Sequence, residues 1–129
     1  MKNRKKNFVI LIIIVILVIC IYIWLSTSAK KRLEALEYES ISMDLVTDGT
    51  YYAEVDAILV FVNIGVTVQN HTITDINIIE HRNGLGKKAE DIIHTMIAEN
   101  TYAVDAISGA TLSSECIKSA VSKALKLGY

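Results

Sequence analysis

The chain has 129 residues, 52% of them apolar, no proline and a net charge of −1. This length accommodates one small soluble core at most, and the near-neutral charge argues against a nucleic-acid-binding protein. The absence of proline excludes a Pro-rich linker or a collagen-like repeat. The charge is unevenly distributed, because residues 1–7 carry four basic side chains and no acid, whereas residues 26–129 carry a net charge of −5.

An uninterrupted apolar run of 18 residues without charge occupies residues 8–25. As a helix this run would span about 27 Å, close to the ~30 Å hydrocarbon core of a bilayer. A cleavable signal peptide has a shorter apolar core of about 7 to 15 residues, so we favour an uncleaved transmembrane anchor. The basic tail of residues 1–7 outweighs the three basic residues at 30–32. We therefore expect the N-terminus inside the cell membrane and the C-terminal domain on the extracytoplasmic side.

Residues 29–43 show a helical pattern of apolar positions among alternating charges, with Glu34, Glu37 and Glu39 on the solvated side. This pattern predicts a juxtamembrane helical stalk over residues 26–46. The turn at Asp48-Gly49 then opens a soluble domain that spans residues 47–129.

Three strands are predicted in the first half of that domain. Residues 51–57 alternate loosely, and residues 60–69 alternate strictly, with five aliphatic residues on one face. A turn at residues 69–71 leads into a returning strand over residues 72–80, which predicts an antiparallel hairpin.

The second half of the domain reads mainly as helix. A loop at residues 81–86 precedes a helix over residues 87–99, whose apolar stripe would pack on a sheet. Residues 101–107 suggest a short strand, and a final helix covers residues 112–126. Together these elements predict an α+β fold, a small antiparallel sheet with helices packed on one face, preceded by a single transmembrane helix.

Candidate chemistry concentrates in two glycine-bearing loops that each precede a predicted helix, one with Gly84 and Gly86 and one with Gly109. Helix starts present unpaired N–H groups that bind anions such as phosphate. From spacing alone, the hydroxyls at Ser108, Thr111, Ser113 and Ser114 fit N-caps and turns without a ligand equally simply. His71, His81 and His94 lie on different predicted elements, so no metal site is predicted, and no catalytic residue can be assigned. With Cys20 inside the apolar run, Cys116 has no disulfide partner in the chain.

The sequence Asp-Ala-Ile-Ser-Gly-Ala-Thr at residues 105–111 resembles the D-x-x-S-G-A-T sequence of the FMN-binding domain family. That family includes the covalent-flavin subunits of the sodium-pumping NADH:quinone reductase and of Rnf-type electron-transfer complexes. The residues at 48–51 resemble the opening of the family's domain, and Gly84-Leu85-Gly86 resembles its glycine loop. The resemblance covers residues 47–127 and departs from the family at residues 81–83, where His-Arg-Asn replaces Glu-Thr-Pro.

The resemblance implies that Thr111 carries FMN through a phosphodiester, installed by a separate flavin transferase that uses FAD as donor. The residues that complete the sequence read by the transferase are then Asp105, Ser108, Gly109 and Ala110. By the same resemblance Gly84, Leu85 and Gly86 lie against the flavin ring.

The function implied is a membrane-anchored electron carrier, placed between an electron donor in or at the membrane and an extracytoplasmic acceptor. Such a protein would act as an electron-transfer module or subunit rather than as an enzyme alone. Two alternatives stay open: a flavin-free anchored module for interaction or sensing, and non-covalent binding of a phosphate ligand at the same loops.

Overall fold

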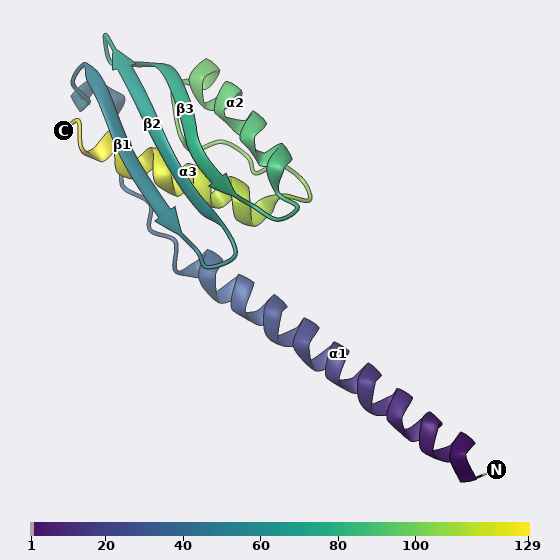
Figure 1. Ribbon diagram of the computed structural model, residues 1–129. Coiled ribbons are helices and arrows are strands. Elements are labelled where there is room, and N and C mark those ends of the chain that lie inside the picture. Colours follow the sequence, from purple (N-terminus) through teal and green to yellow (C-terminus); the bar gives the residue numbers. More distant parts are fainter. Residues whose placement is uncertain (1) are drawn as a thin grey trace. The chain divides into compact units, whose positions relative to one another are not determined.

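The computed structural model describes residues 2–129, with the side chains of residues 6–28 and 30–129. The chain divides between Glu34 and Ala35 into two compact units. In chain order, the elements shown in Figure 1 are α1 (Lys2–Glu34), η1 (Met43–Leu45), β1 (Gly49–Asp56), β2 (Phe61–Gln69), β3 (Thr72–Arg82), η2 (Lys87–Asp91), α2 (Ile92–Glu99) and α3 (Thr111–Lys126).

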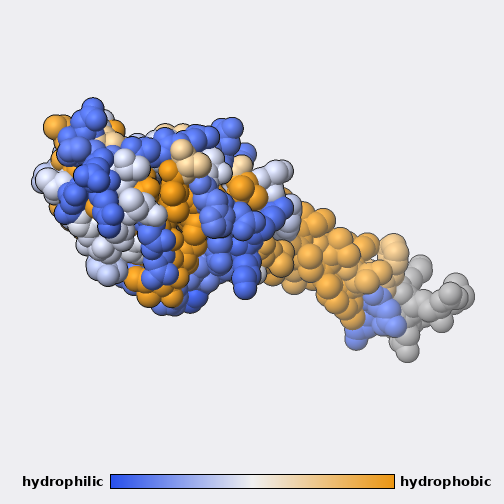
Figure 2. All heavy atoms as spheres, turned by 90° about the horizontal axis from the view of Figure 1, so that it is seen from above, coloured by the Kyte–Doolittle hydropathy of each residue, from blue (hydrophilic) through white to orange (hydrophobic). Residues whose placement is uncertain are grey.

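The first unit is the single helix α1. Its described side chains from Lys6 to Thr27 are all exposed, and Figure 2 shows an almost continuous hydrophobic surface along it. Over the described residues, α1 is the helix that is long and apolar enough to cross a membrane. The predicted anchor at residues 8–25 lies within this helix. An exposed apolar surface of this extent requires cover by lipid or protein.

The second unit is built on a three-stranded antiparallel sheet of order β1-β2-β3. The alternation that predicted β2 sets the register, in which Val66 faces Tyr51 on one side and Ile76 on the other. The hairpin between β2 and β3 turns at Asn70 and His71, whose φ values of 50° and 58° match the left-handed central residues of a two-residue turn. The predicted strands and this turn are therefore confirmed.

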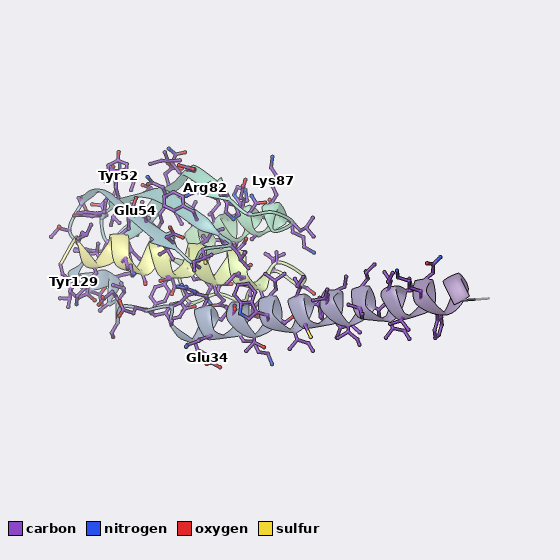
Figure 3. The ribbon with its side chains drawn as sticks, turned by 60° about the horizontal axis from the view of Figure 1, so that its bottom comes forward. Glu34, Tyr52, Glu54, Arg82, Lys87 and Tyr129 are labelled. Carbon is purple, nitrogen blue, oxygen red and sulfur yellow. The ribbon has the colours of Figure 1, made fainter. Side chains whose placement is uncertain are left out.

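One face of the sheet is buried beneath the helices. Helix α3 packs across β1 and β2, and α2 packs against β3. The shared core includes Ile64 and Ile73 from the sheet, Met96 from α2 and Ile117 from α3, all at most 1% exposed. Figure 3 shows Tyr52 and Glu54 on the opposite face of the sheet, pointing away from the helices. This layering confirms the predicted α+β fold with helices on one face.

The prediction of a helical stalk is correct only as far as Glu34 and wrong beyond it. Residues 35–46, here called the strap, are mostly extended and belong to the second unit. Ser119 Oγ donates a 2.6 Å hydrogen bond to the Glu37 carbonyl, and the Glu39 N–H donates to Ser122 Oγ at 3.3 Å. These buried serines of α3 pair with strap backbone groups that a helix would have paired internally. The strap ends at the fully buried Val46.

The second half of the domain also departs from the predicted elements. Strand β3 continues through His81 and Arg82, so the loop is only residues 83–86, and the helix over residues 87–99 begins with the 3-10 turn η2. The short strand predicted at residues 101–107 is wrong. Asn100 ends α2 in a left-handed conformation, and its side-chain oxygen accepts the Ile73 N–H from β3. Residues beyond Asn100 therefore turn away from the strand edge and run as a loop to α3.

Candidate functional site

Three loops meet at the start of α3 and form an open hollow of about 320 Å³. The turn between β1 and β2, the loop after β3 and the loop before α3 each contribute to its wall. The lining residues are Leu59, Val60, Asn83, Gly84, Leu85, Gly86, Gly109, Ala110, Thr111, Leu112 and Ser113. Six of the eight predicted site residues are therefore brought together, whereas the exposed Asp105 and Ser108 lie outside the lining. Leu59 and Val60 were not among the predicted site residues, because only the tertiary structure brings the β1–β2 turn to the hollow.

The hydroxyl of Thr111 is exposed at the first residue of α3. The N-cap position before it is Ala110, which has no capping side chain, and among the described residues the side-chain hydrogen bonds at the start of α3 are made by Ser113 and Ser114 and not by Thr111. The first intrahelical bond of α3 runs from the Ser114 N–H to the Ala110 carbonyl, so the three preceding N–H groups have no partner within the helix. An accessible hydroxyl thus sits beside the positive end of a 16-residue helix.

The loop before α3 is held in shape by Ser114, which is fully buried. Its Oγ donates to the Ala110 carbonyl at 2.9 Å and accepts the Ile107 N–H at 3.0 Å. Gly109 has a φ of 76°, a left-handed conformation that favours glycine. Because Ser113 and Ser114 are both buried, Thr111 and Ser108 are the hydroxyls of this cluster that a large group can reach.

The glycine loop after β3 packs directly on the first turn of α3. Gly86 lies so close to Ser113 that a Cβ added there would be 2.2 Å from the serine Oγ, so only glycine fits without displacement. Gly84 has a φ of 53° and open space around it. Between them Leu85 is 97% exposed, the most exposed large apolar side chain of the second unit. The loop therefore presents one leucine and bare backbone to the hollow.

Behind this loop lies a buried hydrogen-bond network that the sequence did not predict. The His81 side chain is 1% exposed; its Nδ1 lies 3.0 Å from Glu90 Oε1, and its Nε2 lies 3.1 Å from Ser113 Oγ. A carboxylate can only accept, so Nδ1–H donates to Glu90, and in the neutral ring Nε2 accepts from the serine hydroxyl. These three hydrogen-bonded side chains join β3, η2 and α3 behind the glycine loop. A buried histidine that pairs with one carboxylate and one hydroxyl on other elements has no spacing signature in the sequence.

Further along α3, burial and the negative charges of Glu115 and Asp56 raise the pKa of the Cys116 thiol to about 12. The thiol is therefore protonated at neutral pH and is not a nucleophile. Burial and the Glu115 carboxylate, which accepts the phenol hydrogen bond, also raise the pKa of Tyr38 in the strap.

Within the described side chains, no three His, Cys, Asp or Glu residues cluster in a way that would hold a metal ion.

The chemical character of the hollow fits a flavin nucleotide bound at one end through phosphate. Leu59, Leu85 and Leu112 offer apolar surface suited to a flat ring, while the α3 start offers N–H groups and a hydroxyl suited to the phosphate. The fold places the glycine loop and the Ser-Gly-Ala-Thr sequence side by side, although 22 residues separate Gly86 from Gly109 in the chain.

Comparison with protein-family models finds a match to the FMN-binding domain over residues 60–126. No curated protein and no solved structure matches the chain significantly. The matched region runs from Val60, the residue before β2, to the last residue of α3, and it contains every residue that lines the hollow except Leu59. With more than half of its length matched, the chain belongs to the FMN-binding domain family.

Proposed function

We propose that this chain is a membrane-anchored electron carrier that holds FMN through a phosphodiester on Thr111 and works on the extracytoplasmic side. The observation that carries the proposal is the Thr111 hydroxyl, which is exposed in the wall of the hollow and has no hydrogen-bond partner among the described residues. A hydroxyl committed to an N-cap bond would be a poorer acceptor for a large group.

The attachment reaction is a phosphoryl-type transfer from FAD bound to a separate flavin transferase. The Thr111 oxygen forms a bond to the phosphorus of the FMN half, the pyrophosphate P–O bond breaks, and AMP leaves. The hydroxyl proton passes to a base of the transferase. Asp105 and Ser108 are exposed, precede the acceptor residue in the sequence and lie outside the lining of the hollow, so they are suited to recognition by the transferase rather than to contact with the ring.

Each part of the hollow then has a distinct role. The first-turn N–H groups of α3 favour the remaining negative charge of the phosphodiester. Gly109 and Ala110 leave the approach to Thr111 uncrowded, and Leu85 offers an apolar contact to the ring. FMN, when bound, supplies the redox chemistry, while these residues fix its position and exclude water from one side.

Helix α1 supplies the membrane anchor in this proposal. Its basic N-terminal tail favours the cytoplasmic side, which leaves residues 35–129 outside. A covalent cofactor suits that location, because a dissociated one would diffuse away. The partners are an electron donor in or at the membrane and an acceptor outside it. Protease treatment of intact cells or spheroplasts tests this topology, since an external domain is digested and a cytoplasmic one is protected.

The decisive experiment is co-expression of the full chain with an active flavin transferase, followed by a denaturing gel viewed under ultraviolet light. The chain should fluoresce, and the peptide that contains Thr111 should gain the mass of FMN less water. Thr111→Ala should abolish the label, while the matched control Thr95→Ala, which removes an exposed threonine hydroxyl on α2, should leave the label in place.

Each other outcome contradicts the proposal in a recognisable way. A non-fluorescent wild-type chain would favour the flavin-free module, and flavin lost on denaturation would favour non-covalent binding. Label that persists in Thr111→Ala would move the bond to Ser108. The visible flavin absorbance of the labelled chain should also be lost on addition of a reductant and return on addition of an oxidant. Absorbance that does not change in this way would contradict the proposed electron transfer.

A further inference from the structure

The side chain of Lys88 crosses from one glycine loop to the other. Lys88 is the second residue of η2, immediately after the Gly84–Gly86 loop. A Cβ added to Gly109 would lie 2.9 Å from Lys88 Nζ and 3.5 Å from its Cε. The ammonium group therefore rests against the backbone of Gly109, two residues before Thr111.

The protein itself makes no use of this positive charge within the part of the chain whose side chains are described. The salt bridges there are His81–Glu90, Arg82–Glu80 and Lys118–Glu115, and none includes Lys88. No hydrogen bond from Lys88 Nζ to another described residue is present either. Arg82, the other nearby cation, is occupied by Glu80 and by the ring of Phe61, 4.5 Å from its guanidinium carbon.

The neighbouring Lys87 provides an internal comparison. It has the same charge and lies in the same turn, but Figure 3 shows its side chain extending away from the domain. The two adjacent lysines thus differ in position: the Lys88 ammonium group lies against Gly109, in the loop that leads to Thr111, whereas Lys87 extends away. Lysine is a flexible point charge, suited to an anion whose oxygens carry a diffuse charge.

We propose that the Lys88 ammonium pairs with the phosphodiester formed on Thr111, and that Gly109 lacks a side chain partly to admit it. This inference rests on the proposed function, because the phosphodiester is the anion it requires. A methyl group at Gly109 would both meet the ammonium group and strain a backbone at a φ of 76°. Lys88 is therefore a positioning and binding residue for the cofactor, with its charge directed at the one permanent negative charge that attachment creates.

A chemical footprint tests the contact without any change to Lys88. The full chain, purified in detergent after co-expression with the transferase, is compared with the unlabelled Thr111→Ala chain. Both are treated with a water-soluble acetylating reagent, and the modified peptides are quantified by mass spectrometry. Flavin attachment should slow acetylation of Lys88 roughly two- to fivefold, the range expected for an exposed ion pair, and leave Lys87 unchanged. Equal rates at Lys88 in the two samples would overturn the inference.

Charge substitutions supply the second measurement. Lys88→Met should lower the rate of flavin attachment by roughly two- to fivefold at low salt, Lys88→Arg should retain it, and the difference should shrink at high salt. Lys87→Met is the matched control and should behave as wild type. If Lys88→Met and Lys87→Met are labelled equally fast, the inference fails although the proposed function stands. If the wild-type chain takes up no flavin at all, it is the proposed function that fails.

Discussion

The hollow has a buried side and an exposed side, and the two are built differently. On the buried side, His81 pairs with Glu90 and with the Ser113 hydroxyl, while the Ser114 hydroxyl pairs with the backbone of the loop before α3. No fully buried described side-chain polar atom lacks a partner. On the exposed side, the Thr111 hydroxyl and the Lys88 ammonium have no partner among the described residues. The buried side fixes the shape of the site, and the exposed side leaves groups free to bind. Substitutions on the two sides should therefore separate folding from cofactor capture.

The largest effect on folding is expected from Gly86→Val on the buried side. A Cβ there would be 2.2 Å from Ser113 Oγ, so the loop or the helix must shift, at a cost of about 3 kcal/mol in the free energy of unfolding. Urea unfolding of residues 35–129 measures this cost. Gly84→Asn is the matched control; it has open space and asparagine tolerates a φ of 53°, so it should cost under about 1 kcal/mol. Equal costs at the two glycines would contradict the close packing of Gly86.

A smaller loss, about 2 kcal/mol, is expected from His81→Leu, which leaves the buried Ser113 hydroxyl without its partner. Adding Ser113→Ala to His81→Leu should recover part of the loss, because the unpaired group is then removed. The exposed His94→Leu is the control and should change the free energy of unfolding by no more than about 0.5 kcal/mol. Strict additivity of the His81 and Ser113 substitutions would show that the two side chains do not interact.

The pH dependence of folding should report the buried Cys116. Its pKa is raised from 9.0 to about 12, so above pH 9 the unfolded thiol loses its proton while the folded thiol keeps it. The free energy of unfolding should therefore fall as pH rises from 9 towards 12, with this group contributing at most about 1.4 kcal/mol per pH unit. Urea unfolding of residues 35–129 and of its Cys116→Ala variant, below and above pH 9, isolates the contribution. The same slope in both proteins would refute it.

The smallest effect on folding is expected from Leu85→Ser on the exposed side. Since Leu85 is 97% exposed, the free energy of unfolding should change by less than about 0.5 kcal/mol. If the leucine covers the ring, however, quenching of flavin fluorescence by iodide in the labelled chain should increase. Leu127→Ser, at an exposed leucine beyond α3, should change neither quantity. Unaltered quenching in Leu85→Ser would place the ring elsewhere.

The sheet and the last helix were predictable because their apolar periodicity reflects burial directly. Val62, Ile64, Val66 and Val68 alternate along β2 and are all fully buried. The glycines of the site were also predictable, since Gly84 and Gly109 adopt the left-handed conformations that favour this residue. Their meeting in one hollow depended on the family resemblance, because spacing alone does not bring residues 84 and 109 together.

Features that depend on partners distant in sequence were not predictable. The charges and leucines of the strap predict a helix, yet its backbone forms hydrogen bonds with serines 82 and 83 residues away in the sequence. Residues 101–107 have strand-like composition, but Tyr102 instead donates to the Glu39 carbonyl of the strap. Lys88 and His81 are ordinary surface-type residues in the sequence, and only the fold places one over Gly109 and the other behind Gly86.

The strap also links the segment after α1 to the residues that follow α3. The strap and the residue after it contact residues beyond α3. The Tyr129 hydroxyl donates to the Ser40 carbonyl of the strap, and the N–H of Thr47, which follows the strap, donates to the Gly128 carbonyl at 2.8 Å. Contacts between residues so far apart in the sequence slow folding, because the entropy of loop closure is lost before the contacts form. The strap is therefore fixed in place only when the residues that follow α3 are also in place, which couples the segment after α1 to the segment after α3. Deletion of Gly128 and Tyr129 should therefore leave the second unit more readily digested by protease. Full resistance of the shortened chain would show that the contacts of these two residues are dispensable.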